Sequence, residues 1–271
     1  MSSSARSSGS AISEISAGLY GAKKVVLGQN HLPDRGGAGV IEKRTLADAE
    51  RRDWLRLFRS ENVGPATFLT LIEHFDDAGR AIEAAPDLSR CGGRKRAIRI
   101  APVIEIEEEI TALCALGGRM VALCEPDYPE ALAAIHDPPP ILSVLGDTAL
   151  LSRPSVAVVG AQNASAAGRR LAPEISAGTS RNGFTVISGL ARGIDTAAHE
   201  GALGAQPSAA TIAVIAGGAD IVYPTENQAQ YERIVEEGAV ITEQGLGTQP
   251  TAPLPSAQPD GLRAFTGNID S

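Results

Sequence analysis

The stretch SVAVVGAQNASAAGRRLAPEISAGTSRNGFTVISGLARGIDTAAH, residues 155–199, decides the fold. Two apolar runs, 155–159 and 184–188, alternate with helical patterns at about 165–182 and 195–204. The alternation continues with a strand at 211–216, a helix at about 226–237 and a strand at 239–242. Apolar strands that alternate with helices predict an α/β domain with a parallel, doubly wound sheet that helices cover on both faces.

The sequence before this stretch divides into three parts. Residues 1–44 are rich in Ser, Gly and Ala and predict a disordered leader. Residues 45–118 predict a small all-α unit, in which Thr45 caps the first helix and Pro65 occupies the first turn of the second. Further helical patterns fall near 78–84 and 102–116. Short apolar runs at 120–124 and 141–145 predict two more strands, so we place the α/β domain at 119–252.

Charge and composition limit the possible functions. The 271 residues are 43% hydrophobic and 21% charged, with a net charge of −8. Residues 120–271 carry 7 basic and 16 acidic side chains, so any nucleic-acid contact must be local. Cys91, Cys114 and Cys124 form no zinc or disulfide pattern, and no signal or membrane-spanning segment is evident. We therefore predict a cytoplasmic protein with reduced thiols, no metal site and no membrane association.

Glycines follow three of the predicted strands. Gly160, Gly189 and Gly217 each stand where a strand ends, and the carboxyl ends of parallel strands share one rim of the sheet. Their backbone N–H groups could approach a phosphate beside a helix N-terminus. The pattern does not fit a dinucleotide site, because Gly160 and Gly168 miss the GxGxxG spacing. We expect the three loops to converge on a phosphate-bearing ligand.

The segment SGLARGIDTAAH, residues 188–199, carries the polar groups of this rim. Arg192 offers a guanidinium fork for a phosphate, and Asp195 could cap the following helix. His199 lies one turn into that helix, where a buried, hydrogen-bonded side chain is a better interpretation than a general base. No catalytic constellation and no cofactor site are predicted.

At these residues the chain resembles the DNA-processing protein A family, DprA or Smf. The resemblance rests on VAVVGAQNASAAG at 156–168, SGLARGIDTAAH at 188–199, GGADIVYPTEN at 217–227 and ITEQGLGT at 241–248. Upstream, residues 53–75 resemble the family's sterile-alpha-motif-like domain, and Val63-Gly64-Pro65 also looks like a helix-hairpin-helix turn.

The resemblance implies an extended Rossmann-like fold that forms homodimers, binds single-stranded DNA and delivers it to the RecA recombinase in natural transformation, without catalytic turnover. The DNA-binding residues carried over are Gly160, Ala161, Gln162, Ser165, Gly168, Ser188, Gly189, Ala191, Arg192, Gly193, Asp195, Gly217, Tyr223 and Asn227. One position departs from the family, which has Gly-Ser-Arg where this chain has Gly160-Ala161-Gln162. Glutamine donates a hydrogen bond but brings no charge to a phosphate.

A second hypothesis follows from the same rim. A Rossmann-like enzyme could hold a nucleotide or sugar phosphate there, and a carboxylate poised beside Gly217-Gly218 would favour that activity. Asp220 is the acidic residue close to these glycines in the sequence.

The last residues, 253–271, predict an out-of-frame tail. The family continues with a block like HFPRRNRIIAGLS, whereas this chain reads PLPSAQPDGLRAFTGNIDS. Synonymous codons for residues 253–267 exist that encode HFPRRNRMASGLSL when the first base is dropped. We expect a chain with this tail to have an incomplete α/β domain and, because it lacks those arginines, to bind DNA weakly.

Overall fold

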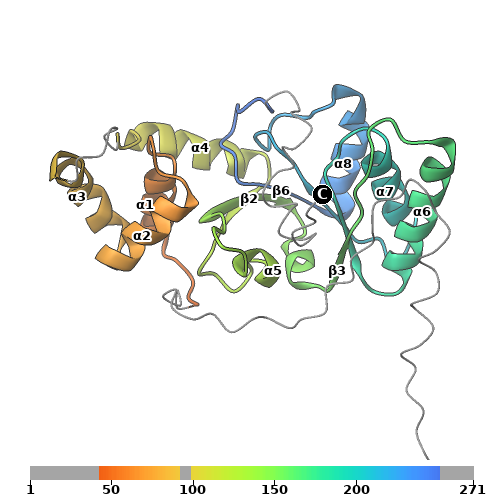
Figure 1. The fold of residues 1–271 in the computed structure, drawn as a ribbon, viewed down its shortest axis with the longest axis horizontal. Coiled ribbons are helices and arrows are strands. Elements are labelled where there is room, and N and C mark those ends of the chain that lie inside the picture. Colours follow the sequence, from red (N-terminus) through yellow and green to blue (C-terminus); the bar gives the residue numbers. More distant parts are fainter. Residues whose placement is uncertain (1–42, 92–98, 251–271) are drawn as a thin grey trace, which may run out of the picture.

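The computed structural model describes residues 43–91 and 99–250, with side chains given outside 86–91, and comprises a helical unit followed by an α/β unit (Figure 1). The predicted leader, up to residue 42, and the tail at 253–271 lie outside the described residues. The out-of-frame tail therefore stays a prediction, which the sequence of the coding region tests. Among the described residues, no helix combines the length and apolarity that a membrane crossing requires.

The helical unit packs around an aromatic pair. It contains α1 (Asp48–Phe58), α2 (Pro65–Phe75), α3 (Ala78–Cys91) and α4 (Val103–Ala115). Trp54 and Phe68 are buried edge to face, with ring centroids 5.1 Å apart. Pro65 occupies the first turn of α2, as predicted. The predicted cap at Thr45 is wrong, because α1 begins at Asp48 and the Glu50 carboxylate accepts the Ala47 N–H at 3.0 Å.

Within the described residues, the sheet has six strands in the order β1-β2-β6-β5-β4-β3. The strands are β1 (Arg119–Ala122), β2 (Ile141–Gly146), β3 (Ser155–Ala157), β4 (Thr185–Ser188), β5 (Thr211–Val214) and β6 (Ala239–Thr242). Neighbours from β3 to β6 pair in parallel, which confirms the Rossmann-like core. At the other edge, where the sequence predicted two more strands without a direction, the sheet is mixed, since β2 pairs antiparallel with both β1 and β6.

Three helices connect the parallel strands: α6 (Ala166–Arg181), α7 (Ile194–Leu203) and α8 (Gln228–Glu237). Because β3 to β6 are neighbours in chain order, right-handed crossovers place all three helices on the same face. Consistent with this, α7 packs between α6 and α8, and the three helices group together in Figure 1. The expectation of a doubly wound sheet is therefore wrong for the described strands.

Two short elements that the sequence did not predict, α5 (Glu130–Ala133) and the 3-10 helix η2 (Thr148–Ser152), flank β2.

Partly buried contacts of Arg59 and Arg51 join the helical unit to the α/β unit. The Arg59 guanidinium binds the Glu109 carboxylate, with its shortest contact at 2.8 Å, and donates to the Glu243 carbonyl at 2.9 Å. Arg51 pairs with Glu125, whose side chain is 7% exposed. One hydrophobic cluster continues from the helical unit into the sheet. The helical unit is therefore docked against the β1 and β2 side of the sheet rather than tethered to it.

Candidate phosphate-binding rim

The loops that follow β3 and β4 interlock at the carboxyl ends of these strands. Ile194 N–H donates to the Ala161 carbonyl at 3.3 Å. Gly193 has φ of +83°, and a Cβ built there would lie 2.3 Å from the Gln162 carbonyl oxygen. Only glycine fits this conformation and this close approach. The predicted convergence is confirmed for these two loops.

Two glycines of the rim make room for one side chain. A Cβ at Gly160 would lie 2.5 Å from Ile194 Cγ1, and a Cβ at Gly168 would lie 3.2 Å from Ile194 Cδ1. Both positions therefore allow Ile194, the first residue of α7, to pack beneath the loop after β3. Ser165 caps α6 by accepting the Gly168 N–H at 3.1 Å. Gly160, Gly168 and Ser165 thus have structural roles in this chain.

Asp195 is buried close to the backbone of both loops. It does not cap α7, whose N-cap is Gly193, but lies in the first turn and is buried. Its carboxyl accepts hydrogen bonds from the backbone of Ala191, Gly189 and Gly160, so it connects the two loops. Burial raises its pKa to about 7, although these hydrogen bonds act in the opposite direction. The Gly160 and Gly189 N–H groups thus face the Asp195 carboxyl in this structure, and their approach to a ligand stays a prediction.

Ser188 and His199 also belong to the buried framework. The Ser188 hydroxyl lies 2.7 Å from the Val158 carbonyl and also within reach of Asp195, so it can donate to either. His199 Nδ1 lies 2.8 Å from Thr211 Oγ1, which donates onward to a backbone carbonyl. Complete burial lowers the pKa of His199 to about 3, so its ring is neutral. The interpretation of His199 as a structural residue is confirmed.

The third loop reaches the rim through residues other than its glycine. A Cβ at Gly217 would lie 3.0 Å from the Thr248 carbonyl oxygen and 3.1 Å from Pro250 Cδ, because residues 245–250 cover this position. Gly217 is therefore packed beneath Thr248 and Pro250, and its role in binding a ligand stays a prediction. Instead, buried Asn227 in η3 (Thr225–Asn227) donates to the Leu190 carbonyl at 2.8 Å and to Thr196 Oγ1 at 3.0 Å. This anchor fixes the 223–227 segment against the loop after β4.

The outer surface of the rim is a shallow depression of about 420 Å³. Its lining residues are Gln162, Asn163, Arg169, Arg192, Gly193, Thr196, Ala197 and Glu200. Arg192 is exposed and pairs with Glu226, and this hydrogen bond is the main cause that raises the pKa of Arg192. Tyr223, 52% exposed, lies on the 223–227 segment, which Asn227 anchors to the loop that carries Arg192. A guanidinium, amide and hydroxyl donors and an exposed aromatic ring therefore gather on one surface.

Sequence reasoning did not include several residues of this surface as binding candidates, among them Asn163, Thr196, Glu200 and Glu226. Asn163 and Glu226 are direct neighbours of predicted site residues in the sequence, so an extension of the motifs by one residue would have found them. Thr196 and Glu200 follow from the helical period of α7, which places them one turn apart on the exposed side. Ala191, by contrast, acts through its backbone on Asp195.

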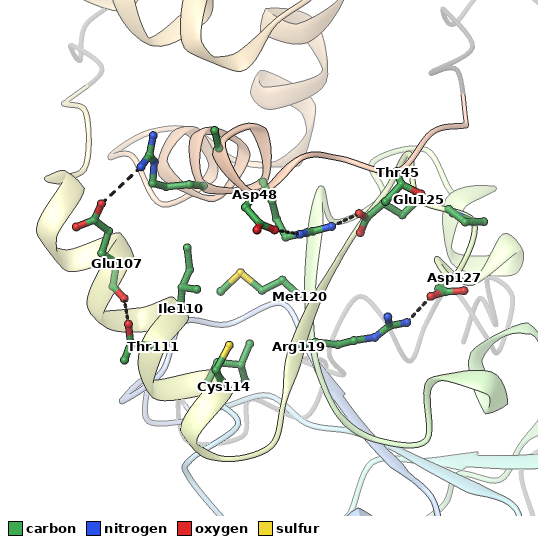
Figure 2. Close-up of a pocket in the computed structure, with 15 residues that line it drawn as sticks. Thr45, Asp48, Glu107, Ile110, Thr111, Cys114, Arg119, Met120, Glu125 and Asp127 are labelled. Carbon is green, nitrogen blue, oxygen red and sulfur yellow. Dashed lines mark hydrogen bonds and ion pairs between the residues drawn. The ribbon is translucent and has the colours of Figure 1, made fainter.

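A larger cavity, of about 780 Å³, lies away from the rim, between α1, α4 and β1 (Figure 2). Its charged side chains pair with one another: Arg51 with Asp48 and Glu125, and Arg119 with Asp127. Figure 2 shows these pairs around Met120 and Ile110 at the junction of the two units. Because its charges are internally matched, this cavity belongs to the docking of the helical unit, and the candidate site remains the rim.

Fold and site together define a class: a Rossmann-like α/β protein with a helical N-terminal unit and a mixed polar and aromatic surface at its strand ends. The family model for DNA recombination-mediator protein A matches residues 119–254, and the DprA-like N-terminal HHH domain matches 48–112. The chain belongs to this DprA/Smf family. The second model describes the helical unit as a helix-hairpin-helix domain, in agreement with the Val63-Gly64-Pro65 turn between α1 and α2.

Individual relatives agree with the family models. The chain is 42% identical over 123 residues to the DNA processing protein DprA of Streptococcus pneumoniae, covering 45% of this chain and 43% of the relative. It is 29% identical over 221 residues to Protein Smf of Synechocystis, covering 76% and 54%. The X-ray structure of DprA from Streptococcus pneumoniae matches with a TM-score of 0.59 at 26% identity, covering 76% of this chain and 71% of that one. The chain spans about half the length of these curated relatives.

Proposed function

We propose that this protein binds single-stranded DNA through the rim and acts as a recombination mediator that delivers the strand to RecA during natural transformation. The observation that carries the proposal is exposed Arg192 on the interlocked loops, with exposed Tyr223 on the segment that Asn227 anchors to the loop after β4. A guanidinium pairs with a phosphate, and an aromatic ring stacks on an unpaired base. A duplex hides its base faces, so this combination favours single strands.

The depression offers further donors around Arg192. Gln162 and Asn163 supply amide groups, and Arg169 supplies a second guanidinium. The carboxylates of Glu200 and Glu226 offset the positive charges of the two guanidinium groups, and the Gln162 side chain is uncharged. We therefore expect modest affinity that falls steeply with salt, because phosphate contacts release counterions.

Fluorescence anisotropy with labelled oligothymidylate tests this function. The protein is titrated at two low salt concentrations, with a duplex of equal length and free nucleotides as competitors. We expect binding of the single strand that weakens with salt and that the duplex competes for poorly. Equal competition by duplex, or binding that is independent of salt, would contradict the proposal.

The remaining parts of the proposal rest on membership of the family. We propose a homodimer that works in the cytoplasm, where RecA is found, and that binds DNA without turning it over. Light scattering of the purified protein tests the dimer, and assembly of RecA filaments on oligothymidylate with and without the protein tests delivery. The structure gives no support to the alternative of an enzyme acting on a nucleotide or sugar phosphate, since the Asp220 carboxylate accepts the Gly247 N–H at 2.8 Å and thereby holds a loop.

A further inference from the structure

The guanidinium proposed to meet DNA is already bound to a carboxylate of the same chain. Arg192 Nε donates to Glu226 Oε1, and both side chains are about half exposed, at 55% and 51%. The mutual hydrogen bond raises the pKa of Arg192 and lowers the pKa of Glu226. A carboxylate and a phosphate bind a guanidinium in the same way, through charge-assisted hydrogen bonds. The Glu226 carboxylate therefore occupies the position on the Arg192 guanidinium that a DNA phosphate would take under the proposed function.

The backbone on both sides of this pair is fixed. Glu226 precedes Asn227, whose buried amide is bonded to the Leu190 carbonyl and to Thr196 Oγ1. Arg192 follows Leu190 by two residues and precedes Gly193, which is held against the loop after β3. The contact joins segments that are 34 residues apart in the sequence. The fold thus presents the carboxylate to the guanidinium from an anchored position.

We propose that Glu226 is a specificity-determining residue, whose carboxylate competes with phosphate for Arg192 and which a DNA strand must displace. The inference rests on the proposed function. An intramolecular competitor acts at an effective concentration on the order of millimolar, so a single phosphate at lower concentration does not displace it. A strand that also stacks a base on Tyr223 and places further phosphates on the depression has additional contacts with which to do so. Glu226 thereby selects polymers over free phosphates and nucleotides.

Glu226→Gln is the decisive variant, because it keeps the shape of the side chain and removes its charge. Glu200→Gln is the matched control, since Glu200 lines the same depression and, within the described structure, is not the ion-pair partner of Arg192. We expect Glu226→Gln to tighten oligothymidylate binding by about two- to fivefold, the range expected for an exposed ion pair. The gain in Glu200→Gln is expected to be smaller, and in an Arg192→Ala background Glu226→Gln is expected to give no specific gain.

Inorganic phosphate provides a readout that does not depend on DNA. Thermal shift is measured with phosphate for wild type, Glu226→Gln and Glu200→Gln, and we expect protection to increase only in Glu226→Gln. Unchanged or weaker binding of both ligands by Glu226→Gln, or the same gain in the Arg192→Ala background, would overturn the inference. If phosphate protection increases as expected but no variant binds oligothymidylate, the role of Glu226 as competitor stands and the proposed function is wrong.

Discussion

Gly193→Ala tests whether the two rim loops form one rigid unit. The Cβ would lie 2.3 Å from the Gln162 carbonyl oxygen and 2.4 Å from the Ala161 carbonyl oxygen, and the backbone has φ of +83°. Both contacts are with backbone, so no side-chain rotation relieves them. The left-handed strain costs ~1–2 kcal/mol, and forcing atoms into a filled space costs a further ~1–3 kcal/mol. We expect the variant to lose ~2–5 kcal/mol of stability from these two effects together.

Gly183→Ala separates the clash from the strain. Gly183 has φ of +84°, close to that of Gly193, but a Cβ there meets no atom within 4 Å. This control is expected to lose only the ~1–2 kcal/mol of backbone strain. Thermal unfolding followed by circular dichroism measures the difference, at about 2–4 °C for each kcal/mol in a chain of this size.

Oligothymidylate binding completes the comparison. In Gly193→Ala the 160–163 loop has to move to admit the methyl group, so we expect binding to weaken even at temperatures where the variant is folded. In Gly183→Ala we expect binding to match that of wild type. Equal melting temperatures of Gly193→Ala and Gly183→Ala would refute the interpretation that the two rim loops interlock. An unchanged affinity of folded Gly193→Ala for oligothymidylate would refute it as well.

Further predictions concern buried polar groups of the same region. The pKa of Asp195 is raised to about 7, so its contribution to the free energy of unfolding falls as pH rises from about 4 to about 7; the stability difference between wild type and Asp195→Asn is expected to change across this range, whereas the difference between wild type and Asp220→Asn is expected to stay constant. The pKa of His199 is lowered to about 3, so its contribution has the opposite sign and is lost as pH falls from about 6.5, and His199→Gln is expected to lack this loss in the same melts. Asn227→Ala removes two hydrogen bonds from buried partners and is expected to cost ~1–3 kcal/mol in urea unfolding, whereas exposed Gln228→Ala is expected to be neutral. A pH-independent difference in the free energy of unfolding between wild type and Asp195→Asn or His199→Gln would contradict the pKa assigned to that residue. Equal stability of Asn227→Ala and Gln228→Ala would contradict the anchoring role of Asn227.

The order of elements could be predicted because periodicity is a local property. The runs at 184–188 and 239–242 became β4 and β6 almost to the residue. Strand direction and sheet position are not local, so nothing in the run at 141–145 indicated that β2 pairs antiparallel with β6. The placement of α6, α7 and α8 on the same face of the sheet also depends on the strand order.

The residue types of the rim could also be predicted, but the partners of these residues could not. Glycine at 160 is equally compatible with a bound phosphate and with the packed Ile194 side chain that the structure shows. The Asp195 carboxylate accepts the backbone groups that an anion would otherwise take, a tertiary arrangement of two loops that sequence spacing does not encode. The pairing of Glu226 with Arg192 could not be predicted for the same reason, since the two residues are 34 positions apart in the sequence.

Cross-linking followed by mass spectrometry tests the central claim most directly, because it locates the strand on the protein. Oligothymidylate is bound to the wild-type protein at low salt, cross-linked by ultraviolet light and mapped to peptides, with Arg192→Ala measured in parallel. We expect cross-links in the peptides that contain Tyr223 and residues 189–193, and their loss in Arg192→Ala. Cross-links confined to the helical unit, or an unchanged pattern in Arg192→Ala, would contradict the placement of the DNA site on the rim.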